Sequence, residues 1–262
     1  MNTDKVKNIK YGLILGSLFL FYLINNYIWL KMDTMLLIWD AHKCFMESLR
    51  FFEEYRNFSW SFFQNIIKIN KFYPIFVNMI ASPFYAIFGR SQDAGVMINS
   101  GIFLGILIFS VYGIGKKIGN RQTGVVSAFI VTMYPLIFTQ SRIYLLDLPL
   151  TAMVSLSVYL LLCANYFENR KYSILFGVGL GFSLLTKINF IIFIIAPLFI
   201  VAYKAFSLSY KERKPFLCDD IPKRKLNFAH SLLLGLLISS IYYAPRFVVT
   251  YKNLLFSPSS PT

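Results

Sequence analysis

Long apolar stretches separated by short polar turns dominate this chain. Seven of them are predicted to be transmembrane helices, at residues 11–30, 94–115, 123–138, 148–167, 172–185, 188–203 and 228–243. A helix needs about 20 apolar residues to cross a bilayer, so the shorter stretches need neighbouring helices to cover them. The pattern predicts an all-α polytopic membrane protein.

Residues 39–76 form the longest polar interruption of this pattern. Between residues 38 and 56, apolar side chains recur on one helical face, at Ile38, Phe45, Leu49 and Phe52. Charged side chains recur on another face, at Asp40, Lys43, Glu47 and Glu54. This periodicity predicts an amphipathic helix that lies on a membrane surface. A second aromatic patch at residues 58–63 is expected to stay at the interface as well.

Segment 74–88 is apolar, but its length alone does not decide whether it crosses the membrane. If it does not cross, segments 1–10, 116–122, 168–171 and 204–227 share one side and carry 15 of the 26 Lys and Arg residues. If it does cross, the side of the N-terminus carries only 8 of them. The positive-inside rule therefore predicts seven spans, a cytoplasmic N-terminus, and an external interfacial or re-entrant segment at 74–88.

Composition supports a membrane protein and argues against nucleic-acid binding. Charged residues make up 15% of the chain, against about 25% in soluble domains. The net charge of +14 comes from basic residues in short loops beside apolar runs, which is typical of topology determinants. Three scattered cysteines and two histidines predict neither a disulfide framework nor a metal cage.

Two carboxylates fall on the predicted external face. Asp40 follows the first span, and Asp147 lies at the mouth of another. An ionisable group at the end of a span is a functional candidate. Each could instead be a helix N-cap, and Pro149 would then lie in the first turn after Asp147.

Three cations lie on the same face near the depth of the bilayer surface, namely Lys71, Arg142 and Lys187. Each by itself is compatible with a basic side chain that reaches to the interface. Together with the two carboxylates they predict a site that holds an anionic lipid headgroup and removes a proton from a second substrate.

An ordered set of motifs resembles the GT-C glycosyltransferases, in particular the group that includes protein O-mannosyltransferases and lipid A aminoarabinose transferases. The motifs are Trp39-Asp40, Lys71-Phe72-Tyr73-Pro74-Ile75-Phe76, Phe88-Gly89-Arg90, Lys116 to Arg121, Ser141-Arg142 through Asp147, Gly179 to Lys187, and Tyr242-Tyr243-Ala244-Pro245-Arg246. The chain departs from the family where Ala41 follows Asp40 and where Pro74 stands alone instead of in a pair.

The resemblance implies transfer of a sugar, with inversion, from a polyprenyl-phosphate donor to a hydroxyl or amine of a lipid, glycan or protein acceptor on the extracytoplasmic face. It implies Asp40 as the general base and Asp147 as a group that positions the acceptor or tunes Asp40. Lys71, Arg142 and Lys187 are the candidates for binding the lipid phosphate. No cofactor is required by this scheme, although the two carboxylates could instead share a divalent cation. The sugar and the acceptor stay open.

The resemblance also implies a GT-C-like organisation in a bacterial or archaeal cell membrane. Residues 1–250 are expected to form one transmembrane module, with an external loop at 31–93 and a basic cytoplasmic loop at 204–227. Residues 251–262 are expected to be a short tail, without the C-terminal domain that family members usually carry, so that a truncated or split gene product is one alternative.

A non-enzymatic membrane protein is the competing class: a transporter, a lipid flippase, a scaffold subunit or an inactive donor-binding fragment. A transporter is expected to place ionisable residues or broken helices near the bilayer midplane. In this chain the charged candidates gather at one face, which favours chemistry at the membrane surface.

Overall fold

The computed structural model describes residues 3–57, 62, 65, 73–211 and 220–256, and it contains no strand within these residues. The helices are α1 (Thr3–Met32), α2 (Trp39–Arg56), α4 (Phe76–Phe88), α5 (Gln92–Ile98), the π-helical turn η1 (Asn99–Phe103), α6 (Leu104–Ile118), α7 (Arg121–Met133), α8 (Pro135–Gln140), α9 (Asp147–Ala164), α10 (Arg170–Leu184), α11 (Phe190–Lys211) and α12 (Asp220–Phe256).

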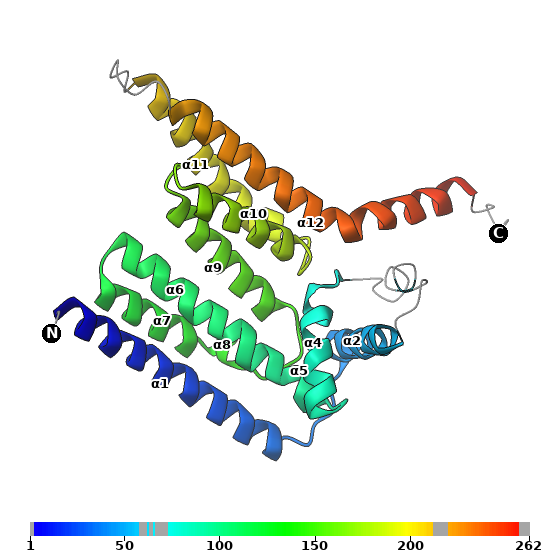
Figure 1. Cartoon of the computed structure of the whole chain (residues 1–262). Helices are drawn as coiled ribbons and strands as arrows, with labels where there is room; N and C mark the ends of the chain where they lie inside the picture. Colours follow the sequence, from blue (N-terminus) through cyan, green and yellow to red (C-terminus); the bar gives the residue numbers. More distant parts are fainter. Residues whose placement is uncertain (1–2, 58–61, 63–64, 66–72, 212–219, 257–262) are drawn as a thin grey trace.

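The helices form two groups that share α9 (Figure 1). Helices α1, α6 and α7 lie alongside one another, and α6 also packs against α9. On the other side of α9, helix α10 packs between α9 and the long helix α12. Helices α2, α4 and α5 gather at one end of this bundle (Figure 1), which is called the α2 end below.

Within the described residues, four helical stretches are long and apolar enough to cross a membrane: Ile9–Met32, Gln92–Ile118, Asp147–Ala164 and Lys223–Phe247. The prediction of an all-α membrane protein is confirmed. Each of the other three predicted spans contains a helix: α7 ends before Pro135, α10 has 15 residues, and α11 has 22 residues with Pro197 inside it. The count of seven spans therefore stays a prediction.

Three further predicted segments are a short helix, a partly helical loop and a patch that lies mostly outside the described residues. Helix α4 has 13 residues, too few to cross a bilayer alone, and the non-spanning arrangement of segment 74–88 stays a prediction. The basic loop predicted at 204–227 is helical at both ends, since α11 continues to Lys211 and α12 begins at Asp220. The aromatic patch predicted at 58–63 falls almost entirely outside the described residues.

Helix α2 confirms the predicted amphipathic helix but corrects its faces. The buried stripe consists of Ala41, Cys44, Phe45, Glu47, Ser48, Phe51 and Phe52, and much of it packs against α4. Glu47, predicted on the charged face, is therefore buried, and Ile38, predicted on the apolar face, is 67% exposed just before the helix begins. The pattern identified the helix, but the partner helix determined which stripe became buried.

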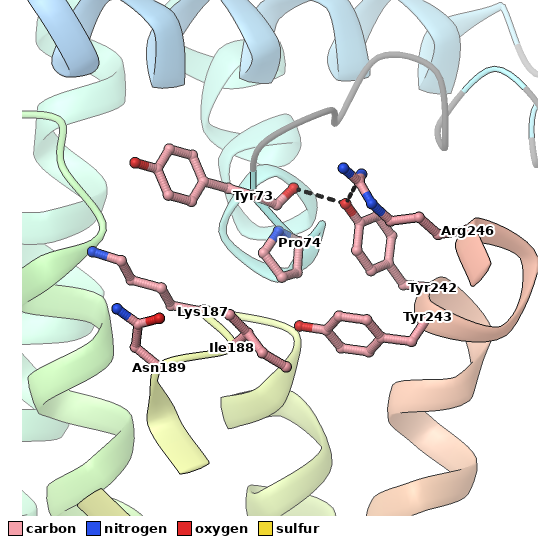
Figure 2. Close-up of a pocket in the computed structure, with 8 residues that line it drawn as sticks. All are labelled: Tyr73, Pro74, Lys187, Ile188, Asn189, Tyr242, Tyr243 and Arg246. Carbon is pink, nitrogen blue, oxygen red and sulfur yellow. Dashed lines mark hydrogen bonds between the residues drawn. The ribbon is translucent and has the colours of Figure 1, made fainter. Parts of the chain in front are cut away.

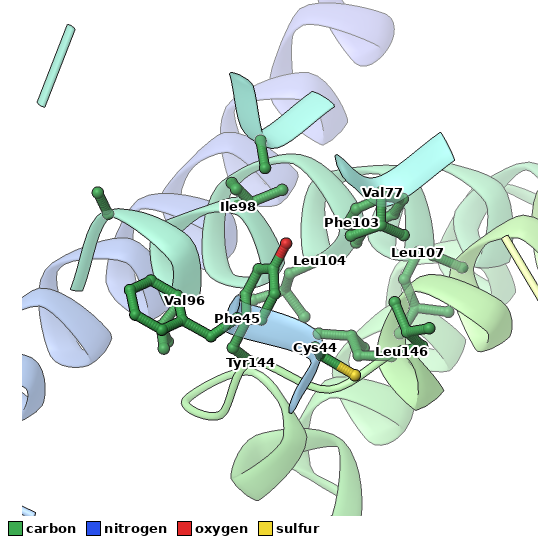
Figure 3. Close-up of a cluster of buried hydrophobic side chains, with 14 of the residues drawn as sticks. Cys44, Phe45, Val77, Val96, Ile98, Phe103, Leu104, Leu107, Tyr144 and Leu146 are labelled. Atoms are coloured by element: carbon green, nitrogen blue, oxygen red, sulfur yellow. The ribbon is translucent and has the colours of Figure 1, made fainter. Parts of the chain in front are cut away.

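The largest buried hydrophobic cluster fastens α2 to the bundle (Figure 3). Cys44 and Phe45 of α2 meet Val77 of α4 and the long α5–η1–α6 helix there. Tyr144 and Leu146 reach the same cluster from the loop at 141–146, which connects α8 and α9. Burial of apolar surface thus places the start of α2 beside the start of α9.

Glycines set the contact between α10 and α12. A Cβ atom on Gly177 would lie 2.5 Å from the backbone oxygen of Ser231, and one on Gly181 would lie 2.7 Å from Cβ of Ile238. Small residues thus allow close packing of this helix pair.

Gly177→Ala is expected to destabilise the protein by about 1–3 kcal/mol, because the new methyl group meets backbone that cannot yield. Gly16→Ala is the matched control, since α1 leaves open space around Gly16. Thermal unfolding of the purified protein in detergent should show a lower midpoint for Gly177→Ala only. Equal midpoints for the two variants would contradict the close contact.

Candidate functional site

A cavity of about 530 Å³ lies at the α2 end, between the segment that joins α1 to α2, the loop at 141–146 and the turn after α10. Four of the five predicted site residues line it: Asp40, Arg142, Asp147 and Lys187. The fifth, Lys71, lies outside the described residues. The cavity brings together side chains that are far apart in sequence, and it is called the carboxylate cavity below.

Asp40 lies in the first turn of α2, where a negative charge is favoured by the helix dipole. Its side chain is 62% exposed, and its Oδ1 atom lies 3.4 Å from Nζ of Lys43. The residue before it, Trp39, has a left-handed backbone with φ of 52°, which costs on the order of 1–3 kcal/mol for a residue of this kind. The alternative interpretation of Asp40 as an N-cap is wrong, because Ile38 occupies that position.

Asp147 is the first residue of α9 and forms an ion pair with Lys187. Nζ of Lys187 lies 2.8 Å from Oδ1 of Asp147, and the two side chains are 21% and 53% exposed. Leu146 holds the N-cap position without a side-chain cap, so the N-cap interpretation of Asp147 is wrong too. Asp147 thus stays about half exposed, while Lys187 is mostly buried.

Arg142 is held against α1 by neutral groups. Its Nε atom donates to Oδ1 of Asn26 at 2.9 Å, and Nη2 donates to Oδ1 of Asn25. The guanidinium also lies over the rings of Trp29 and Phe138, at 4.7 and 3.8 Å from their centroids. Because amide oxygens and aromatic rings carry no net charge, these contacts orient the cation without neutralising it.

A second cavity of about 520 Å³ adjoins the first (Figure 2). Its lining consists of Tyr73, Pro74, Lys187, Ile188, Asn189, Tyr242, Tyr243 and Arg246. Tyr73 and Lys187 line both cavities, so they stand at the boundary between them. Lys187 and Arg246 both contribute positive charge to the second one, which is called the cationic cavity below.

Hydrogen bonds from α12 hold the cationic cavity together (Figure 2). The hydroxyl of Tyr242 donates to the backbone oxygen of Tyr73 at 3.3 Å, and Nη1 of Arg246 donates to that same hydroxyl at 2.6 Å. The hydroxyl of Tyr243 donates to the backbone oxygen of Leu184 at 2.9 Å. The tyrosines thus tie α12 to the segment before α4 and to the turn that carries Lys187.

Sequence reasoning missed several residues of these two cavities. Tyr242 and Arg246 were identified only as part of a motif at the end of an apolar run, and Asn189 was not identified. Asp33 is a further carboxylate that lines the carboxylate cavity. Its Oδ1 atom accepts a hydrogen bond from the backbone N–H of Met35 at 3.0 Å. A cation that ends an apolar run was the available signal for Arg246.

Cys44 also lines the carboxylate cavity, but as a neutral thiol. Burial, together with the nearby charges of Glu47 and Asp40, raises the pKa of Cys44 to about 12. The thiolate is the nucleophilic form of cysteine, so Cys44 is not a nucleophile near neutral pH. Within the described residues, no group of three or more His, Cys, Asp or Glu side chains could hold a metal ion.

The fold and these cavities define a polytopic membrane protein with a charged site at one end of its helices. Residues 73–219 match the family described as dolichyl-phosphate-mannose-protein mannosyltransferase. Because the match covers more than half of the 262 residues, the chain belongs to this family of GT-C membrane glycosyltransferases. No curated protein and no solved structure matched the chain. The resemblance inferred from the motifs is confirmed, and Arg142, Asp147 and Lys187 lie within the matched range.

Proposed function

We propose that this protein transfers a sugar from a polyprenyl-phosphate donor to a hydroxyl or amine of an acceptor. The observation that carries the proposal is the meeting of Asp40, Asp147, Arg142 and Lys187 around one cavity. Carboxylates and cations side by side suit a reaction that removes a proton from one substrate and leaves negative charge on another.

The proposed chemistry is a direct displacement with inversion at the anomeric carbon. The acceptor oxygen or nitrogen forms a bond to that carbon, while the bond from the carbon to the phosphate oxygen breaks. Asp40 takes the acceptor proton, and the electron pair of the broken bond leaves with the lipid phosphate. General base catalysis contributes typically 10²–10⁴-fold, and cations near the developing phosphate charge contribute further.

The other residues divide between the two substrates. Asp147, held by Lys187, positions the acceptor or tunes Asp40. Lys187 and Arg246 line the cationic cavity and offer positive charge to the phosphate there, and Arg142 offers positive charge from the carboxylate cavity. Lys71 remains a further phosphate candidate on the strength of its motif. An acceptor in the carboxylate cavity and a phosphate in the cationic cavity would meet at this boundary.

The proposed orientation follows from the distribution of basic residues. A cytoplasmic N-terminus places the α2 end on the extracytoplasmic face, where a polyprenyl-phosphate sugar and an envelope acceptor can meet. The protein would then be an integral protein of a bacterial or archaeal cell membrane.

Transfer by the purified protein in lipid nanodiscs tests this function. The protein is offered radiolabelled polyprenyl-phosphate sugars or the corresponding nucleotide sugars, together with membrane extracts as acceptor. Transfer from the lipid-linked donors only, with an inverted anomeric configuration in the product, is expected. Transfer from nucleotide sugars, or from neither donor, would refute the proposed donor class.

A further inference from the structure

The loop at 141–146 carries Arg142 and leads directly into Asp147, yet it has no helical or strand pairing of its own. Its backbone passes through the buried cluster, where Tyr144 is 1% exposed and Leu146 is 6% exposed. Buried carbonyl groups need hydrogen-bond donors, or they cost stability. The position of both charged residues therefore depends on what satisfies this loop.

Two adjacent residues of η1 supply these donors. Nδ2 of Asn99 donates to the backbone oxygens of Ile143 and Leu145, at 2.7 and 2.9 Å. Oγ of Ser100 donates to the backbone oxygen of Ser141 at 2.6 Å. The carbonyls of residues 141, 143 and 145 are thus held by one short stretch of a neighbouring helix.

The π-helical turn explains how consecutive residues can serve one loop. A π-helix closes hydrogen bonds five residues apart, so each residue advances by a smaller angle than in an α-helix. Asn99 and Ser100 begin this turn, and both side chains are fully buried. Turns of this kind inside α-helices occur frequently at functional sites.

Asn26 of α1 links this contact to Arg142. Its Nδ2 atom donates to Oγ of Ser100 at 3.2 Å and to Oγ of Ser141 at 2.9 Å. Its Oδ1 atom accepts the bond from Nε of Arg142. One buried network therefore fixes both the backbone of the loop and its cationic side chain.

We infer that Asn99 is a positioning residue for transfer: it holds the 141–146 loop so that Arg142 and Asp147 face the carboxylate cavity. The inference rests on the proposed function. It goes beyond it by assigning a role to a neutral residue that does not line either cavity.

Asn99→Asp tests this role with little change in shape, because it removes the two N–H donors and sets an oxygen against two carbonyl oxygens. A misplacement of about 1 Å at a reacting group can lower catalysis on the order of 100-fold, and a drop in kcat/KM of that size is expected. Ser110→Ala is the matched control, since Ser110 is buried in the same helical stretch and its Oγ atom has no hydrogen-bond partner within the described residues. Equal kcat/KM values for the two variants would overturn the inference.

A double-mutant cycle separates positioning from general destabilisation. If Asn99 acts by placing Arg142 and Asp147, Asn99→Asp should lose most of its effect in a background that carries Arg142→Met and Asp147→Asn. The same 100-fold loss in both backgrounds would show a merely structural role and overturn the inference.

A labelling experiment reports on the loop without any transfer assay. The reporter is Leu145→Cys, placed in a variant whose Cys44, Cys163 and Cys218 are replaced by alanine. Adding Asn99→Asp should raise the rate at which a water-soluble maleimide labels position 145, whereas adding Ser110→Ala should not. An unchanged rate with Asn99→Asp overturns the inference. If Asn99→Asp raises the labelling rate but the protein without this substitution transfers no sugar, the proposed function is refuted. The role of Asn99 in holding the 141–146 loop would still be supported.

Discussion

Asp40→Asn should reduce sugar transfer by about 10²–10⁴-fold while leaving the fold intact, because the amide cannot accept the proton of the acceptor. The charge it removes is 62% exposed and meets Lys43 in a surface ion pair, and such pairs contribute about 0–1 kcal/mol to stability. The thermal unfolding midpoint should therefore hardly change. Transfer rates and unfolding curves of the same preparation check both halves of this prediction.

Asp33→Asn is the matched control for this experiment. Asp33 is a carboxylate of the same cavity, but it accepts the backbone N–H of Met35, which an asparagine oxygen can also do. Asp33→Asn should keep most of the transfer activity. Undiminished transfer by Asp40→Asn would eliminate Asp40 as the base, and equal losses in both variants would point to the overall charge of the cavity instead.

Lys187→Met should lower transfer by about 10²–10³-fold, the range seen when one group that stabilises transition-state charge is removed. Lys187 is only 21% exposed, pairs with Asp147 at 2.8 Å and lines both cavities. Methionine has a side chain of similar length to lysine but no charge. Asp147 therefore loses its ion pair, and the phosphate loses the positive charge of Lys187. Both a lower kcat and a higher KM for the lipid-linked donor are expected.

Lys31→Met provides the comparison for Lys187→Met. Lys31 forms an ion pair with Asp93 at 3.3 Å. The side chains of Lys31 and Asp93 are 58% and 42% exposed, and neither residue lines the two cavities. Steady-state kinetics of the two variants, with the donor concentration varied, should show the loss for Lys187 only. The same kinetic constants in both variants would contradict a role for Lys187 at the boundary of the cavities.

Local periodicity was sufficient to predict most of the helices. The amphipathic pattern before Arg56 and the basic turn ending at Lys187 both appear where the sequence indicates them, because apolar spacing and the ends of apolar runs are local properties. The break between α7 and α8 was missed, although the residue before Pro135 is biased away from the helical region. The sequence alone left that break inside one predicted span.

The missing parts of the site depend on contacts between distant segments. The hydrogen bond from Tyr242 to the backbone of Tyr73 joins residues 169 positions apart. The motif that contains Tyr242 and Arg246 therefore could not indicate which distant segment forms the cavity with it. Likewise, Asn99 lies inside an apolar stretch and shows its partners only once the 141–146 loop is placed against it. Glu47 was assigned to the wrong face for the same reason, since its burial follows from the packing of α2 against α4.

The most direct test of the central claim is photo-crosslinking with a polyprenyl phosphate that carries a diazirine on its first isoprene unit. After irradiation in nanodiscs, mass spectrometry of peptides locates the label, and unlabelled polyprenyl phosphate serves as competitor. We expect competable label at the walls of the two cavities, around residues 33–44, 142–147, 187–189 or 242–246. Competable label confined to the opposite end of α9, around Cys163 and Tyr172, would contradict the proposed site.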